Sequence, residues 1–185
     1  LWSVLAGLAV LWLMHGAKAR KGGGQTLDEL VRFGLKGAQG MLPLALIILL
    51  ALTLGTVTKL LGTGAFVAKV ASANMSAATF LPVTFLVSAG VAFATGTAWG
   101  TFAIMVPVAL PAAAAFGAPA APFLAAALSG GIFGDHASPI SDTTIMASMA
   151  AVTDHVDHVR TQLPYALLAG GASVFAYFLV GLFFL

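Results

Sequence analysis

Apolar runs long enough to cross a lipid bilayer make up most of this chain of 185 residues. An α-helix needs about 20 consecutive apolar residues to cross a hydrocarbon core about 30 Å thick, and several runs exceed that length. They lack the alternation of apolar and polar residues that is typical of outer-membrane barrels. With 60% hydrophobic residues, 8% charged residues and a mean hydropathy of +1.03, the composition lies outside the range of soluble domains. We therefore predict an all-α, polytopic membrane protein surrounded by the lipid bilayer.

The few charges argue against a nucleic-acid partner. The net charge is only +2, and the basic residues gather at residues 18–21 and at Arg32 and Lys36. Such a cluster beside an apolar run predicts a cytoplasmic loop by the positive-inside rule. The sequence has no Cys, which excludes a disulfide framework and a thiolate metal site within it. Because it begins on Leu1, within an apolar run too short to span a membrane, we expect a fragment of a longer protein.

We expect a single transmembrane domain over residues 1–185, in which helices alternate with polar interruptions. Residues 15–40 are predicted to be a cytoplasmic loop followed by a short interfacial helix. Thr26, three residues before Glu29, predicts a capping box at the start of that helix. The other predicted segments are a truncated helix at 1–14, a helix at 41–58, a loop with a partial helix at 59–76, a broken helix or hairpin at 77–117, a broken helix at 118–152 and a final helix at 163–185.

Residues 94–101 interrupt the long apolar run at 77–116 with three threonines and two glycines. Two geometries are compatible with this pattern: two crossing half-helices, or a re-entrant hairpin that enters the membrane and returns. In both, the non-helical backbone has to be buried in protein or line a cavity, because lipid offers it no hydrogen-bond partners. A third possibility is that Gly96 and Gly100 form a small-residue face for helix packing.

A second interruption, residues 130–144, carries two carboxylates between strongly apolar runs. Pro139 has no backbone N–H, and the glycines of this segment tolerate irregular backbone, so we predict that the helix breaks here. Asp135 and Asp142 would then lie at bilayer depth, where an ionised side chain costs about 2.5 to 3.5 kcal/mol and commonly has a function. The alternative is that both aspartates are helix caps in a loop at the membrane surface.

The two interruptions together supply the oxygen ligands that a hard cation such as sodium prefers. A broken helix offers carboxylates, hydroxyls and freed backbone carbonyls in one place. Since a proton and a sodium ion would compete for one carboxylate, such a site is sufficient for cation/proton exchange. If the interruptions meet near the membrane midplane, the predicted ion ligands are Asp135, Asp142, Ser138, Ser141, Thr143, Thr95 and Thr97, with Thr101 and Thr144 as further hydroxyls. His136 is predicted either to modulate this site or to be a structural histidine.

The polar segment 153–162 holds several ionisable side chains. Asp154, Asp157 and His158 are candidates for modulating the ion site, from an interfacial position near its mouth. A metal site that includes Asp154, His155 and His158 is an alternative, because residues three or four apart share a helical face. The segment lacks the His-Glu-x-x-His motif of helix-borne zinc sites, so no metal is predicted here.

Three blocks of the sequence resemble the C-terminal half of the NhaC-type sodium/proton antiporters: residues 94–105, 133–145 and 153–165. The resemblance implies a fold of the ion-transporter superfamily, with inverted repeats and re-entrant hairpins. Segments 94–101 and 134–144 would then be the two elements of the second repeat's site. Members of that family are more than twice as long, and Ala137 stands where a Cys is often expected, so this position is not predicted as a ligand. Some relatives exchange malate and lactate with sodium and protons.

We therefore predict a secondary transporter that exchanges sodium for protons by alternating access. Asp135 is the first candidate, and Asp142 the second, for the carboxylate that both ions share. The protein would be no enzyme and would need no cofactor beyond the transported ions. Its expected location is the bacterial inner membrane. The expected partner is the missing N-terminal half of the transporter, and a homodimer is also possible. The alternatives are a sodium-coupled malate or lactate exchanger, a membrane-embedded metalloenzyme, and a non-transporting assembly fragment.

Overall fold

The computed structural model describes residues 2–19 and 26–185, and every regular element in these residues is a helix. The helices are α1 (Trp2–Ala19), α2 (Leu27–Leu60), α3 (Thr63–Asn74), α4 (Ala77–Thr95), α5 (Ala98–Ala115), α6 (Ala120–Ala137), α7 (Asp142–Ala150) and α8 (His155–Phe183). Among the described residues, α4, α5 and α8 are each long and apolar enough to cross a membrane. The prediction of an all-α membrane protein is therefore confirmed.

The chain divides into two compact units, residues 1–46 and residues 47–185. The first unit holds α1 and the start of α2, where the predicted capping box is confirmed. The Thr26 N–H donates to the Glu29 carboxylate at 2.8 Å, and the Glu29 N–H donates to the Thr26 hydroxyl at 3.3 Å. Of the predicted loop, residues 15–19 continue α1, and residues 20–25 lie outside the described residues.

Helix α2 differs from the expected pair of segments at 26–38 and 41–58, because it runs without a break from Leu27 to Leu60. Gly37 and Gly40, which lie near the expected boundary, are helical. A glycine lowers helix stability by about 1 kcal/mol relative to alanine, and a long helix tolerates that cost. The expected break between an interfacial helix and a membrane span is therefore wrong: both segments belong to one continuous helix.

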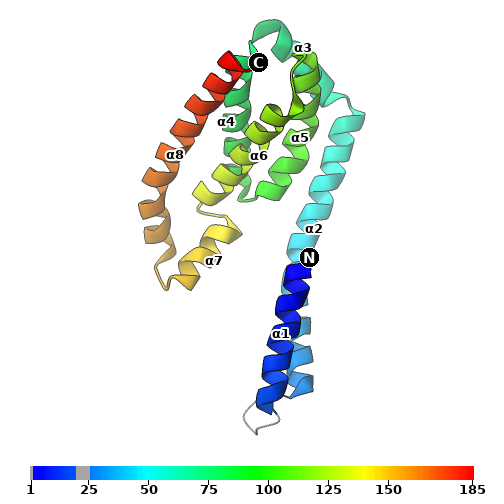
Figure 1. Ribbon diagram of the computed structural model, residues 1–185, viewed down its shortest axis with the longest axis vertical. Coiled ribbons are helices and arrows are strands. Elements are labelled where there is room, and N and C mark those ends of the chain that lie inside the picture. Colours follow the sequence, from blue (N-terminus) through cyan, green and yellow to red (C-terminus); the bar gives the residue numbers. More distant parts are fainter. Residues whose placement is uncertain (1, 20–25) are drawn as a thin grey trace. The chain divides into compact units, whose positions relative to one another are not determined.

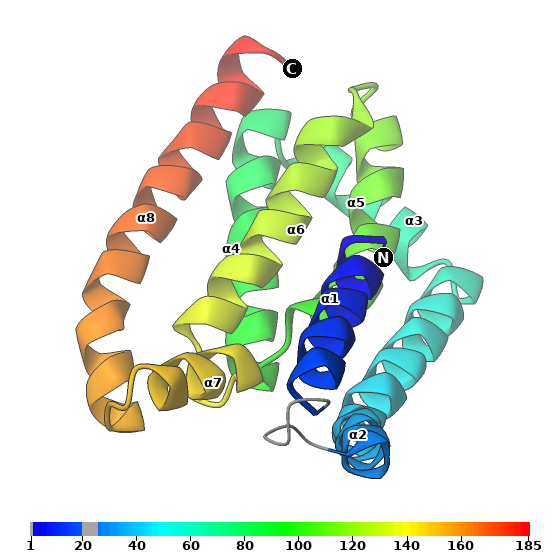
Figure 2. The same cartoon turned by 60° about the horizontal axis from the view of Figure 1, so that its bottom comes forward.

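In the second unit, α4, α5 and α6 run up and down beside one another, and α8 flanks α4 and α6 (Figures 1 and 2). Their shared core is aromatic and alanine-rich. The rings of Phe80, Phe116 and Phe123 lie with centroids 5.3 to 5.8 Å apart. The Ser129 and Tyr177 hydroxyls, 2.7 Å apart, join α6 to α8. These contacts join the first two-thirds of α6 to α4 and α8.

Two glycines allow α6 to approach the backbone of α4. A Cβ atom added at Gly130 would collide with the carbonyl oxygen of Phe85, and one added at Gly134 would collide with that of Ala89. Spacing of small residues by four is typical of closely packed membrane helices. We expected these glycines in irregular backbone, but both lie within regular helix, so their role is close packing.

The chain reverses direction between α4 and α5, which form an antiparallel hairpin (Figure 1). Gly96 ends α4 in the left-handed conformation, with φ of 67°. The two arms have 19 and 18 residues, so each is about 27 to 28 Å long at 1.5 Å per residue. The expectation of two crossing half-helices does not describe this segment. Gly96 also lies outside any helix, which excludes the Gly96 and Gly100 packing face.

Helix α8 begins earlier than the predicted start at residue 163. Asp154 caps it, accepting from the backbone N–H groups of Val156 at 2.9 Å and Asp157 at 3.2 Å. The polar segment 155–162 is therefore the first part of this long helix rather than a separate connection. Before it, α7 crosses the end of α6 and leads to the start of α8 (Figure 2).

A substitution tests the close packing of α6 on α4. Gly134→Ala should lower the melting temperature of the full-length protein, because the new methyl group meets the Ala89 carbonyl, and overpacking typically costs 1 to 3 kcal/mol. The matched control is Gly171→Ala on α8, where nothing lies within 4 Å and where alanine should be neutral or stabilising. Equal melting temperatures for the two variants would contradict the packing role of Gly134.

Candidate ion-binding site

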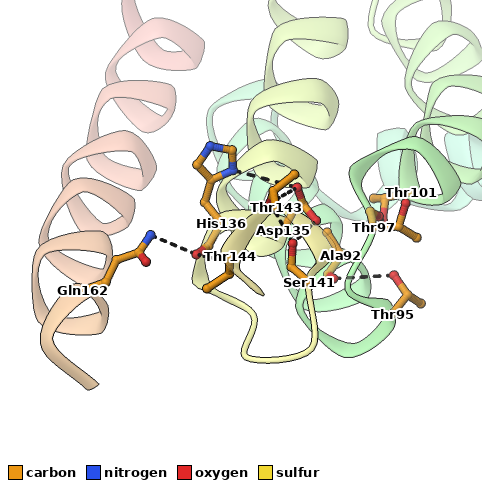
Figure 3. Close-up of polar contacts among 10 residues, drawn as sticks. All are labelled: Ala92, Thr95, Thr97, Thr101, Asp135, His136, Ser141, Thr143, Thr144 and Gln162. Carbon is orange, nitrogen blue, oxygen red and sulfur yellow. Dashed lines mark hydrogen bonds and ion pairs between the residues drawn. The ribbon is translucent and has the colours of Figure 1, made fainter. Parts of the chain in front are cut away.

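Asp135 is the buried centre of a cluster of polar side chains at one end of the helical core (Figure 3). It lies in the last turn of α6 and is 5% exposed. The Ser141 hydroxyl donates to its Oδ1 at 2.8 Å, and the Thr143 hydroxyl donates to its Oδ2 at 3.1 Å. The two hydroxyls are themselves 2.8 Å apart. The carboxylate of one helix is thus bound by hydroxyls at the start of the next.

The loop between α6 and α7 owes its position to Ser138 and Pro139. Ser138 is fully buried, and its hydroxyl donates to the carbonyl oxygen of Phe93 at 2.7 Å. This bond satisfies a carbonyl in the last turn of α4 that lacks a partner within its helix. Pro139 cannot continue the hydrogen bonding of α6 because it has no N–H. Ser138 therefore anchors the loop to α4, and the loop carries Ser141 to Asp135.

The charge of Asp135 has little compensation within the part of the chain that the structure describes. No Lys or Arg of that part forms an ion pair with it. Its nearest basic group is the Nδ1 atom of His136, 3.9 Å from Oδ2, on a side chain that is 61% exposed. A buried carboxylate is costly unless a cation, a proton or a full set of hydrogen bonds compensates it. The two hydroxyl donors are the side-chain compensation that the described residues give to Asp135.

The two predicted interruptions do meet in space. A Cβ atom added at Gly96 would lie 2.8 Å from the carbonyl oxygen of Ile140, so the turn between α4 and α5 contacts the loop at 138–141. The threonine hydroxyls of that turn, however, face their own helices. Thr95 donates to the Val91 carbonyl at 2.8 Å, and Thr101 donates to the Thr97 carbonyl at 3.0 Å. No hydrogen bond among the described residues joins Thr95 or Thr97 to Asp135.

Asp142 lies apart from this cluster. It is the first residue of α7, its side chain is exposed, and it forms no side-chain hydrogen bond with the other described residues. The N-cap of α7 is Ser141, so Asp142 does not have the capping role that we considered as an alternative. Asp135 is no cap either, because its hydrogen bonds come from hydroxyls and not from backbone N–H groups. The structure ranks Asp135 above Asp142 as the buried carboxylate.

The polar residues around the cluster have separate roles. Thr144 donates to the His136 carbonyl at 3.3 Å, and Asp154 caps α8. Asp157 is exposed, and His158 lines a small cavity beside Thr143. The described residues hold no group of three or more His, Cys, Asp or Glu side chains suited to a metal ion. The alternative site at Asp154, His155 and His158 therefore has no support in the geometry.

Two residues hold this region together in roles that the sequence did not predict. The His155 ring lies 3.1 Å from the Ser148 hydroxyl through Nδ1 and 2.7 Å from the Pro139 carbonyl through Nε2. Gln162 donates from Nε2 to the His136 carbonyl at 3.1 Å. These partners are 16 and 26 residues away in sequence, so no local pattern reveals them.

Long apolar helices around a buried carboxylate define the class of this protein: a helical membrane protein with a buried ionisable side chain. The particular family follows from sequence comparison. The Na+/H+ antiporter family matches the chain over residues 2–182, so the chain belongs to that family. This membership favours a transporter over an enzyme. Three of the similar proteins are named as antiporters, which also favours a transporter.

The relatives are considerably longer than this chain. The chain is 42% identical over 159 residues to an uncharacterized protein of Haemophilus influenzae, an alignment that covers 84% of the chain and 30% of that protein. It is 33% identical over 181 residues to the arginine/ornithine antiporter ArcD of Halobacterium salinarum, covering 96% of the chain and 37% of that protein. A malate-2H(+)/Na(+)-lactate antiporter of Bacillus subtilis is 33% identical over 102 residues, which are 55% of the chain and 22% of that protein. The chain thus spans about a third of the length of the first two relatives. No solved structure matches it significantly.

The role of His155 can be tested by hydrogen exchange. His155→Ala removes the bond to the Pro139 carbonyl, so the loop at 138–141 should exchange its amide protons faster and the protein should lose about 1 kcal/mol of stability. Val156→Ala is a suitable control, because this exposed neighbour lies on the same turn of α8. Unchanged exchange in the loop of the His155→Ala variant would contradict the anchoring role.

Proposed function

We propose that this chain forms the ion-binding part of a secondary antiporter that exchanges sodium ions for protons. The observation that carries the proposal is the buried Asp135 carboxylate, whose hydrogen-bond donors are two hydroxyls and which has no Lys or Arg ion pair among the described residues. Sodium prefers oxygen ligands, and Asp135, Ser141 and Thr143 present carboxylate and hydroxyl oxygens to one another within 3.1 Å. A small rearrangement of the hydroxyls would turn their lone pairs toward a bound ion.

The same cluster provides a physical basis for coupled exchange. With a proton on the carboxylate, Asp135 is neutral; with a sodium ion bound, the pair is neutral as well. Only the empty, charged form leaves an uncompensated anion in an apolar surrounding, which is the costly state. If the conformational change of alternating access requires a neutral site, the transporter changes conformation when Asp135 holds a proton or a sodium ion. It does not change conformation when the site is empty. Obligatory exchange follows from this penalty.

The NhaC-type subtype and the C-terminal-half position remain part of this proposal. Residues 94–105, 133–145 and 153–165 carry the resemblance. The contact between Gly96 and Ile140 supports a site in which the turn between α4 and α5 takes part, with Thr95 and Thr97 as ligands after rotation of their side chains. The remainder of a longer transporter would supply the other wall of the pathway. We propose the bacterial inner membrane as its location.

A second candidate function is the exchange of an organic acid together with sodium and protons. The similarity to the malate-2H(+)/Na(+)-lactate antiporter of Bacillus subtilis favours it, although that alignment covers 55% of this chain. The same carboxylate would bind sodium in both cases, so the two candidates differ in the further substrate. Flux that requires added malate or lactate would support this candidate over plain sodium/proton exchange.

Substitution of the two aspartates tests the proposal in proteoliposomes that contain the full-length transporter. Asp135→Asn keeps the size of the side chain and removes its charge, so sodium-driven proton flux should fall by more than about tenfold, the change that 1.4 kcal/mol of lost binding produces. Asp142→Asn is the matched control and should have a much smaller effect, because Asp142 is exposed. Normal flux in the Asp135→Asn variant would refute the proposed site.

A further inference from the structure

A cavity of about 230 Å³, lined by several side chains with polar groups, lies beside the Asp135 cluster, between α6, α7 and α8. Its lining residues carry imidazole, hydroxyl and amide groups beside the methyl groups of alanine and threonine. The lining residues are His136, Thr143, Thr144, Ala147, His158 and Gln162. Two larger cavities, of about 430 and 410 Å³, are lined mostly by apolar side chains and do not include Thr143. The smaller cavity thus joins side chains with polar groups to Thr143 of the proposed ion site.

Gln162 gives the strongest indication of what fills this cavity. Its Nε2 donates to the His136 carbonyl at 3.1 Å, which orients the amide and leaves Oε1 as the free end (Figure 3). Oε1 is buried and has no hydrogen-bond partner within the described residues. An unpaired buried acceptor costs about 1 to 3 kcal/mol, so a hydrogen bond from a water molecule to this atom would be favourable. A water molecule needs only about 10 to 15 Å³ and two to four polar partners, conditions that the cavity meets.

Thr143 connects the cavity to the carboxylate. It lines the cavity, and its hydroxyl lies 3.1 Å from Oδ2 of Asp135. Asp135 itself does not line the cavity and is 5% exposed. A proton from cavity water can bind to the Thr143 oxygen while the original hydroxyl proton moves to Oδ2 of Asp135. The threonine is unchanged after this step, and the carboxylate is neutral.

We propose that the cavity between α6, α7 and α8 is the water-filled route by which protons reach and leave Asp135, with the Thr143 hydroxyl as its last link. This inference rests on the proposed sodium/proton exchange and adds the path of one of the two ions. Gln162 orders the water through Oε1, and His136 and His158 complete the polar wall. The apolar cavities play no part in this path.

Thiol labelling tests the route in the full-length transporter, after replacement of any Cys outside this chain, which has none itself. Ala147→Cys places a thiol on the cavity wall, and a charged methanethiosulfonate reagent reaches it only through water. We expect rapid modification, followed by loss of sodium-driven proton flux. The matched control is Leu168→Cys on the exposed apolar surface of α8, which should remain unmodified.

The outcomes separate the inference from the function on which it rests. An unmodified Ala147→Cys thiol, or modification that leaves the flux intact, overturns the route even when sodium/proton exchange is present. If the parent transporter shows no such exchange, the proposed function fails, while the labelling rate still reports whether the cavity holds water. Gln162→Leu provides a second readout: the maximal flux should fall while the KM for sodium stays unchanged. A change in KM alone would contradict the assignment of Gln162 to the proton route.

Discussion

The hydrogen bonds from Ser141 and Thr143 to the Asp135 carboxylate determine how the functional end of this structure is organised. They join the last turn of α6 to the first turn of α7 across a loop that contains Pro139. A charge so deeply buried demands compensation, and two neutral hydroxyls supply only part of it. In the proposed function, a bound proton or sodium ion supplies the remainder. That need for compensation is the physical origin of the exchange activity that we propose.

Helix packing places this carboxylate, and it does so through small residues. Gly130 and Gly134 allow α6 to contact the carbonyl groups of α4, and Gly96 allows the turn after α4 to contact Ile140. Ser138 then anchors the loop to Phe93, and His155 ties it to α8. The loop is thus held from several helices, although its own backbone forms few regular hydrogen bonds. These contacts from several helices keep the loop in place, so that ion binding can move the ligands together.

The sequence predicted the helical membrane fold, the Thr26 capping box and the burial of Asp135, because each depends on composition or on residues close together in the chain. It did not predict the continuity of α2, since glycine weakens a helix without ending it. The packing role of Gly130 and Gly134 was missed because the same residues also favour irregular backbone. The contacts of His155 and Gln162 depend on where α8 lies relative to α6, which local patterns do not contain.

Proton release on sodium binding tests the central claim most directly. Purified full-length transporter in weakly buffered solution should release protons when sodium is added, because both ions compete for the Asp135 carboxylate. The release should be absent in the Asp135→Asn variant and should persist in the Asp142→Asn variant. Sodium binding without proton release, or equal release from the Asp135→Asn variant, would contradict the assignment of Asp135 as the shared site.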